Sequence, residues 1–134
     1  MVTVSYEDGD RLRVSIRGHE VFTDQPQEDG GGDTAPTPTE LFIAGLGACV
    51  GLYAERFLRR NQLPAAGLQV TCSYTWAEGP HRVGEITLDV EAPGLPPEKR
   101  AAFERVIERC AVHNTLEHPP AIALRVSGAQ TAAA

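Results

Sequence analysis

Residues 37–60 read TPTELFIAGLGACVGLYAERFLRR, and this stretch decides the fold. Thr37 suits the N-cap of a helix and Pro38 its first position. Glu40 falls at the N3 position, from which its carboxylate can accept a hydrogen bond from the Thr37 N–H. The positive charge of ERFLRR suits the C-terminal end of the helix dipole. The stretch therefore predicts a long helix that runs to about Arg60.

The same stretch carries no charged residue between Leu41 and Ala54. An uncharged run of 14 residues is shorter than the roughly 20 that a membrane-spanning helix needs, so we expect the helix to be buried in protein. Its apolar residues lie all round the helix axis, and a chain of this size has difficulty covering such a helix alone. The pattern therefore predicts that part of the helix is buried against a second copy of the chain, in a homodimer.

Strands are predicted on both sides of this helix in the sequence. Residues 2–6 and 11–16 alternate polar and apolar side chains around Asp8-Gly9, where the glycine supplies the positive φ of a tight turn, so they predict a hairpin. Residues 68–76 and 86–90 alternate in the same way and predict two half-buried antiparallel strands.

A second helix is predicted after the proline pair at 96–97. Phe103, Val106, Ile107 and Cys110 recur at i, i+3, i+4 and i+7, and charged residues take the outer face.

The C-terminal residues are less regular. Residues 121–126, AIALRV, are short and β-prone, and residues 127–134 predict a frayed tail. Together the predicted elements indicate one α+β domain over residues 1–134.

Residues 25–36, QPQEDGGGDTAP, contain three consecutive glycines and no apolar periodicity. Such a breaker-rich segment predicts a mobile surface loop or flap. The glycines lack the lysine and the downstream helix pattern of a phosphate-binding loop, so no phosphate site is expected there.

The composition indicates which classes of binding partner are not expected. The 134 residues are 42% hydrophobic and 22% charged, and the formal net charge is −6. A negative net charge repels phosphate backbones and anionic membranes, so neither nucleic acid nor a membrane is an expected partner. The first residues lack the basic and apolar regions of a signal peptide, which makes the cytoplasm the expected location.

Three cysteines, Cys49, Cys72 and Cys110, form an odd and widely spaced set that does not suit a disulfide-framed secreted scaffold. Cys72 alternates with Val70 and Tyr74 on one strand face, so we interpret it as a core residue.

Cys49 has two interpretations. A cysteine in an apolar helix is usually inert, yet the glycines and alanines around this one leave room for another element or a small substrate to approach the sulfur. Cys110 ends the apolar face of the second predicted helix and points toward the same core. The two thiols could therefore meet as a redox pair, or both could serve packing alone.

Cys110 and His113, in CAVH, have the spacing of metal ligands. Zinc requires three or four ligands, however, and His19, His81 and His118 form no second pair at such spacing, so a metal site is not expected. His113 has two other interpretations: it tunes the Cys110 thiol from one turn away, or it caps the end of the helix, where a histidine interacts favourably with the dipole.

Two segments together carry a family resemblance. PTPTELFIAGLGACV, residues 36–50, followed by ERCAVHNTL, residues 108–116, resembles the two-cysteine signature of the OsmC/Ohr superfamily, the osmotically inducible and organic hydroperoxide resistance proteins. RGHEVFTDQP, residues 17–26, resembles the OsmC-like branch of that superfamily. The resemblance covers about residues 17–126. It implies an OsmC-like fold, with antiparallel sheets packed around long central helices in an intertwined homodimer.

The resemblance also implies a thiol peroxidase. In that reading Cys49 attacks the peroxide, and Cys110 resolves the resulting sulfenic acid as a disulfide. Such a cycle needs no metal or flavin, and its electrons come from an external dithiol, which lipoyl proteins supply in the best-known branch.

Two features of the organic hydroperoxide branch are not matched directly. Its catalytic glutamate falls at Thr39, one residue before Glu40. Glu40 is the candidate for that catalytic role, but the capping box already explains it and the structural interpretation is favoured. Its thiolate-stabilising arginine comes from the N-terminal region, where Arg17 is the candidate and Arg11 and Arg13 are nearby. The sequence thus supports a peroxidase for organic hydroperoxides, or else a non-catalytic dimer that binds a small apolar ligand at its interface.

Overall fold

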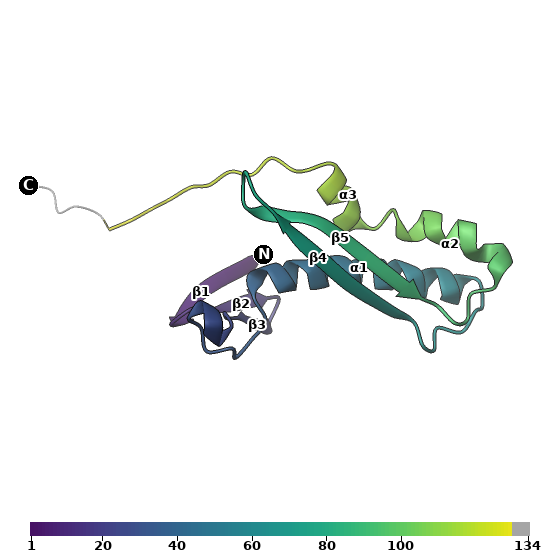
Figure 1. Cartoon of the computed structure of the whole chain (residues 1–134), viewed down its shortest axis with the longest axis horizontal. Helices are drawn as coiled ribbons and strands as arrows, with labels where there is room; N and C mark the ends of the chain where they lie inside the picture. Colours follow the sequence, from purple (N-terminus) through teal and green to yellow (C-terminus); the bar gives the residue numbers. More distant parts are fainter. Residues whose placement is uncertain (130–134) are drawn as a thin grey trace, which may run out of the picture.

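The structure is a computed structural model that describes residues 1–129 as an α+β fold with two antiparallel sheets (Figure 1). The strands are β1 (Val2–Asp8), β2 (Arg11–Ile16), β3 (His19–Thr23), β4 (Gln69–Ala77) and β5 (Arg82–Glu91). The helices are α1 (Pro38–Arg60), α2 (Arg100–Ile107) and α3 (Ala111–Glu117), and 3-10 turns η1 (Gln27–Asp29) and η2 (Pro97–Lys99) precede α1 and α2. The β1-β2-β3 sheet lies toward the N-terminal end of α1, and the β4–β5 hairpin packs along the helix. The predicted fold class is confirmed.

The predicted N-terminal hairpin is confirmed, but the sequence analysis missed its third strand. Gly9 has a φ of 52° in the turn that joins β1 to β2. β3 continues the sheet by pairing antiparallel with β2. The turn between them contains Arg17 and Gly18, whose φ values of 49° and 84° have the signs that a type I′ turn requires. Because arginine rarely adopts a positive φ, this turn signal is weak in the sequence.

Helix α1 begins and ends as the sequence predicts. Thr37 is its N-cap, Pro38 opens it, and the capping box between Thr37 and Glu40 is present. The buried residues of α1 are Ile43, Leu46, Gly47, Val50, Ala54, Phe57 and Leu58. Within residues 1–129, α1 is the one helix long and apolar enough to cross a membrane, but a core helix passes the same test.

Two apolar clusters hold α1 against the rest of the chain. Near its C-terminal end, Phe57 meets Phe103 of α2 edge to face, with 5.4 Å between the ring centroids. Further toward its middle, Leu46 and Val50 pack against Cys110 and against side chains of β4 and β5. The second cluster places the start of α3 directly over α1.

The predicted second sheet is confirmed as the β4–β5 hairpin. Alternate residues of β4 are half-buried against α1, among them Val70 and Cys72. A Cβ at Gly47 would lie 2.7 Å from the Cys72 sulfur, so the helix and the strand approach this closely because residue 47 is glycine.

The second predicted helix is in fact two helices, which corrects the placement of Cys110. Helix α2 ends at Ile107, and Cys110 has φ −64° and ψ 149° as the N-cap of α3. An extended backbone at Cys110 cannot continue a helix, so this residue begins a new one. The expectation that Cys110 ends a single apolar helix face is therefore wrong.

The β-prone segment at residues 121–126 is not a strand in this structure. Ile122, Leu124 and Val126 are exposed, and the segment extends away from the body of the molecule (Figure 1). A strand needs a partner, and no strand within residues 1–129 pairs with this segment. Of the predicted frayed tail, residues 127–129 are exposed and irregular, and residues 130–134 lie outside the described part of the chain.

The glycine-rich loop at residues 25–36 is fastened at both ends to Asp24. The buried Asp24 carboxylate accepts hydrogen bonds from the Gln25 N–H at 2.8 Å, the Thr34 N–H at 3.0 Å and the Thr34 hydroxyl at 2.6 Å. The Asp24 N–H donates to the Pro36 carbonyl at 3.1 Å. The hydrogen bonds from Thr34, followed by that from Gln25, lower the pKa of Asp24 to about 2. The segment predicted as a mobile flap thus has a restrained base.

Candidate functional site

The two thiols considered as a redox pair lie in contact between α1 and α3. Cys49 projects from α1 and packs in the cluster that contains Cys110. The two side chains are neighbours in this cluster, and both thiols are free in this structure. Tertiary packing therefore brings together two residues that are 61 positions apart in the sequence.

The two thiols differ in exposure. The Cys110 side chain is 0% exposed, because α1, β5 and α3 enclose it. Cys49 is half-buried, and its helix neighbours Gly45 and Ala48 are exposed and small. Within the single chain, a small molecule can therefore reach the sulfur of Cys49 but not that of Cys110.

Cys110 owes its environment to its place at the N-cap of α3. Its sulfur accepts a hydrogen bond from the His113 N–H at 3.3 Å. Burial raises the pKa of the Cys110 thiol, and the neighbouring Cys49 raises it further. The backbone N–H groups of His113 and Val112 act in the opposite direction, because they stabilise the thiolate. The sequence analysis missed these donors, since the helix break that creates them carries no glycine or proline.

Cys72 lies apart from this pair, in β4 where that strand packs against α1. Its sulfur is close to Gly47, and burial raises the pKa of its thiol. A half-buried thiol packed on a glycine matches the core interpretation of this residue.

The candidate arginines lie in the N-terminal sheet. Arg17 occupies the β2–β3 turn with an exposed side chain. Arg11 stacks over the Phe22 ring at 4.0 Å and donates to the Thr34 hydroxyl, and Arg13 pairs with carboxylates of the same sheet. None of the hydrogen bonds within residues 1–129 joins an arginine to Cys49. The chain on its own therefore does not bring the predicted cation to the thiol.

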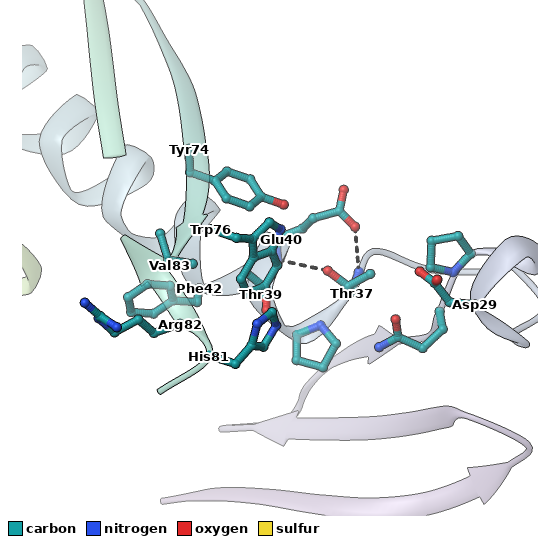
Figure 2. A pocket seen from close by; sticks show the side chains of 13 residues that line it. Asp29, Thr37, Thr39, Glu40, Phe42, Tyr74, Trp76, His81, Arg82 and Val83 are labelled. Carbon is teal, nitrogen blue, oxygen red and sulfur yellow. Dashed lines mark hydrogen bonds between the residues drawn. The ribbon is translucent and has the colours of Figure 1, made fainter. Parts of the chain in front are cut away.

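Glu40 performs the capping role expected from the sequence. Its Oε1 accepts a hydrogen bond from the Thr37 N–H at 2.9 Å, and the Thr37 hydroxyl accepts one from the Glu40 N–H at 3.1 Å (Figure 2). Thr39 and Glu40 line a cavity of about 840 Å³ between the loop and the β4–β5 hairpin. Trp76 and His81 also line that cavity, and their rings stack with 4.6 Å between centroids (Figure 2). The cysteines do not line this cavity, so Glu40 and the thiols lie in separate places in this chain.

His113 is in the first turn of α3, not in the last turn of a longer helix, so of its two interpretations the helix-end cap is wrong. Its ring Nε2 lies 2.9 Å from Glu117 Oε1. The group that contacts Cys110 is the His113 backbone N–H, while the imidazole is paired along the outside of the helix.

The arrangement suits thiol–disulfide chemistry: one accessible thiol, one buried thiol in contact with it, and backbone donors at the buried sulfur. Within the described part of the chain, no group of three or more histidine, cysteine or carboxylate side chains is placed to hold a metal ion.

Comparison with solved structures supports the fold. A protein of Psychrobacter arcticus 273-4 assigned to osmotic stress induction and the detoxification response shares 22% identity at a TM-score of 0.78, over 85% of each chain. An OsmC-like protein from Mycoplasma pneumoniae shares 18% identity at 0.73, over 89% of this chain and 87% of that one. An organic hydroperoxide resistance protein from Elizabethkingia anophelis shares 19% identity at 0.68, over 89% of each.

Comparison with sequence families identifies the chain itself. No curated protein sequence matches it significantly. The profile of the OsmC-like protein family matches residues 30–125, which include both cysteines of the contacting pair and all of α1. The match covers well over half of the chain, and the two-sheet fold agrees with it, so this protein belongs to the OsmC-like protein family.

Proposed function

We propose that this protein is a thiol peroxidase that reduces organic hydroperoxides. The observation that carries the proposal is the contact between half-buried Cys49 and fully buried Cys110. A peroxide-reducing thiol must be accessible, and a resolving thiol must be able to reach its sulfur. These two residues meet both requirements, and structural neighbours named organic hydroperoxide resistance proteins share the fold.

The proposed cycle uses the two sulfurs in turn. The Cys49 thiolate attacks the terminal peroxide oxygen, the O–O bond breaks, and the alkoxide leaves and takes up a proton to become an alcohol. Cys49 is then a sulfenic acid. The Cys110 sulfur attacks the Cys49 sulfur, water leaves, and a disulfide joins the two residues. An external dithiol returns two electrons and restores both thiols.

The surroundings of Cys49 favour an organic substrate. Leu46, Val50 and Tyr53 lie in the same cluster, and small residues border the exposed side of the sulfur. An apolar alkyl group loses contact with water when it lies there, and hydrogen peroxide has no such group. We therefore propose a preference for organic hydroperoxides over hydrogen peroxide.

The complete site requires a homodimer in this proposal. Cys49 must be a thiolate to react, and a buried thiolate needs a nearby cation. Since no arginine within residues 1–129 bonds to Cys49, we assign that role to an arginine of a second copy, with Arg17 as the candidate because its side chain is exposed.

Peroxide consumption tests the proposal. With cumene hydroperoxide and a dithiol reductant, Cys49→Ser should abolish turnover. Cys110→Ser should allow one turnover and leave a sulfenic acid on Cys49 that dimedone traps. Cys72→Ala is the matched control and should retain activity. A wild-type rate no faster than that of free cysteine, at equal thiolate concentration, would contradict the proposal.

A second candidate is a dimer that binds a small apolar ligand. An apolar hollow of about 380 Å³ lies between the N-terminal sheet and the start of α1, lined by Val2, Val4, Leu12, Val14, Ile16, Thr23, Pro38, Leu41 and Phe42. Its walls favour this alternative, as does the threonine at position 39. Ligand binding that survives Cys49→Ser in a protein without peroxidase activity would establish it.

A further inference from the structure

We propose that the external reductant attacks the sulfur of Cys49, and that Cys110 is the sulfur that leaves. This inference rests on the proposed Cys49–Cys110 disulfide. It specifies which half of that disulfide a partner thiol must reach.

Access to the two sulfurs is unequal. Cys110 is 0% exposed, because Leu46, Val50 and other side chains of the same chain enclose it. A second copy of the chain can only cover more surface, so dimerisation does not uncover this sulfur. Cys49 is half-buried in the single chain, and in the proposed cycle its sulfur stays reachable in the dimer because the peroxide must reach it there. An incoming thiol therefore reaches Cys49 first.

The acidity of the leaving thiol has to be weighed against access. Burial raises the pKa of Cys110, which by itself makes it a poorer leaving group. The N–H groups of Val112 and His113 oppose this effect, and the His113 N–H donates a hydrogen bond to the Cys110 sulfur. The two effects on the pKa of Cys110 partly cancel. Burial, in contrast, keeps an attacking thiol away from the Cys110 sulfur almost completely. Access therefore decides which bond forms.

The step is a thiol–disulfide exchange. The reductant thiolate forms a bond to Cys49 Sγ, the Cys49–Cys110 bond breaks, and its electron pair goes to Cys110 Sγ, which takes up a proton from water. When the reductant is a dithiol, its second thiolate attacks the reductant sulfur of the mixed disulfide. Cys49 is released as a thiolate, and the oxidised reductant departs as a cyclic disulfide. Two electrons have then passed from the reductant to the protein.

Mapping the first mixed disulfide tests the inference directly. A Cys72→Ala protein, which has no third thiol to exchange, is oxidised with diamide. It is then mixed with excess 2-mercaptoethanol, quenched with acid at partial reaction, denatured and alkylated. We expect mass spectrometry to find the mercaptoethanol adduct on Cys49 at least roughly ten times more often than on Cys110. A smaller ratio would overturn the inference.

Oxidation with diamide separates this inference from the proposed function. If peroxide fails to form the disulfide but diamide succeeds, the peroxidase proposal fails while the mapping still decides which sulfur is attacked. If diamide forms no bond between Cys49 and Cys110, there is no disulfide to reduce, and the inference falls as well.

A matched pair of variants tests the leaving sulfur. His113→Pro removes the N–H that donates to Cys110, at a first-turn position of a helix where proline is tolerated. His113→Ala removes the same imidazole but keeps the N–H. We expect the first reduction step to be roughly two- to three-fold slower with proline than with alanine. Equal rates in the two folded variants, together with an adduct found mainly on Cys110, would overturn the assignment.

Discussion

At the scale of single residues, Gly47 and Cys72 are complementary in size. A methyl group at position 47 would lie 2.7 Å from the Cys72 sulfur, which is too close for a folded structure to tolerate without movement. Alanine at this helical position gains up to about 1 kcal/mol in helix propensity, but overpacking costs about 1–3 kcal/mol. We expect Gly47→Ala to lower the free energy of unfolding, as measured by urea denaturation.

The double variant Gly47→Ala with Cys72→Ala identifies the cause. With the sulfur removed, the clash disappears, and the gain in helix propensity should raise stability above that of Cys72→Ala alone. If Gly47→Ala destabilises the protein equally in both backgrounds, the close contact between helix and strand is not the reason.

Asp24 gives a second prediction at this scale, and its sign follows from the direction of its pKa shift. The folded-state pKa is about 2, below the usual value of about 3.9 for an aspartate, so the folded protein favours the ionised form. This stabilisation is fully present above about pH 4 and is lost as the pH falls toward 2. We expect Asp24→Asn to lower the urea midpoint at pH 7, and the difference from wild type to narrow between pH 4 and pH 2. A difference that stays constant over that range would show that the carboxylate charge is not involved.

At the scale of elements, the capping box of α1 separates a structural role of Glu40 from a catalytic one. Glutamine at N3 keeps the hydrogen bond to the Thr37 N–H, so Glu40→Gln should preserve stability. Thr37→Ala should cost about 1 kcal/mol in unfolding free energy, because the Glu40 N–H loses its acceptor. Peroxidase activity in Glu40→Gln should match wild type. A large loss of kcat in that variant, at unchanged stability, would instead assign Glu40 to the chemistry.

The elements that the sequence predicts correctly are those whose signals are local. Thr37 and Pro38 mark the start of α1, and the alternation in β4 and β5 marks a half-buried hairpin. The break between α2 and α3 was not predictable, because Ile107 and Cys110 keep helical apolar spacing across it and no glycine or proline interrupts them. The type I′ turn before β3 was missed because its first residue is Arg17.

The candidate site was predictable only in part, because part of it depends on contacts that no local sequence signal encodes. The sequence identifies both cysteines of the pair, and their contact arises from packing among α1, β5 and α3. The N–H donors at Cys110 exist only because α3 begins there. No local pattern encodes that arrangement, since it depends on where the chain folds back.

At the scale of the whole molecule, apolar surface is left uncovered. On α1, Phe42 and Leu52 are 43% and 44% exposed, although this helix forms the core of the fold. In the N-terminal sheet, Val2 and Val4 are exposed too, and Figure 1 shows this sheet to one side of the helical part. Apolar surface shared between a core helix and a sheet is typical of an interface with another chain.

A charge on the outer face of α1 tests whether a second copy covers this surface. We expect light scattering at micromolar concentration to give about twice the 14.4 kDa mass of the chain. Leu52→Glu should shift the protein toward the monomer, because a carboxylate buried in an apolar interface loses its hydration without gaining a partner. Ala101→Glu, on the exposed side of α2, adds the same charge to a helix and should leave the dimer intact.

If an arginine of the partner completes the site, the Leu52→Glu monomer should also lose peroxidase activity while its urea midpoint no longer depends on protein concentration. A wild-type protein that stays monomeric and active would contradict both the interface and the shared site.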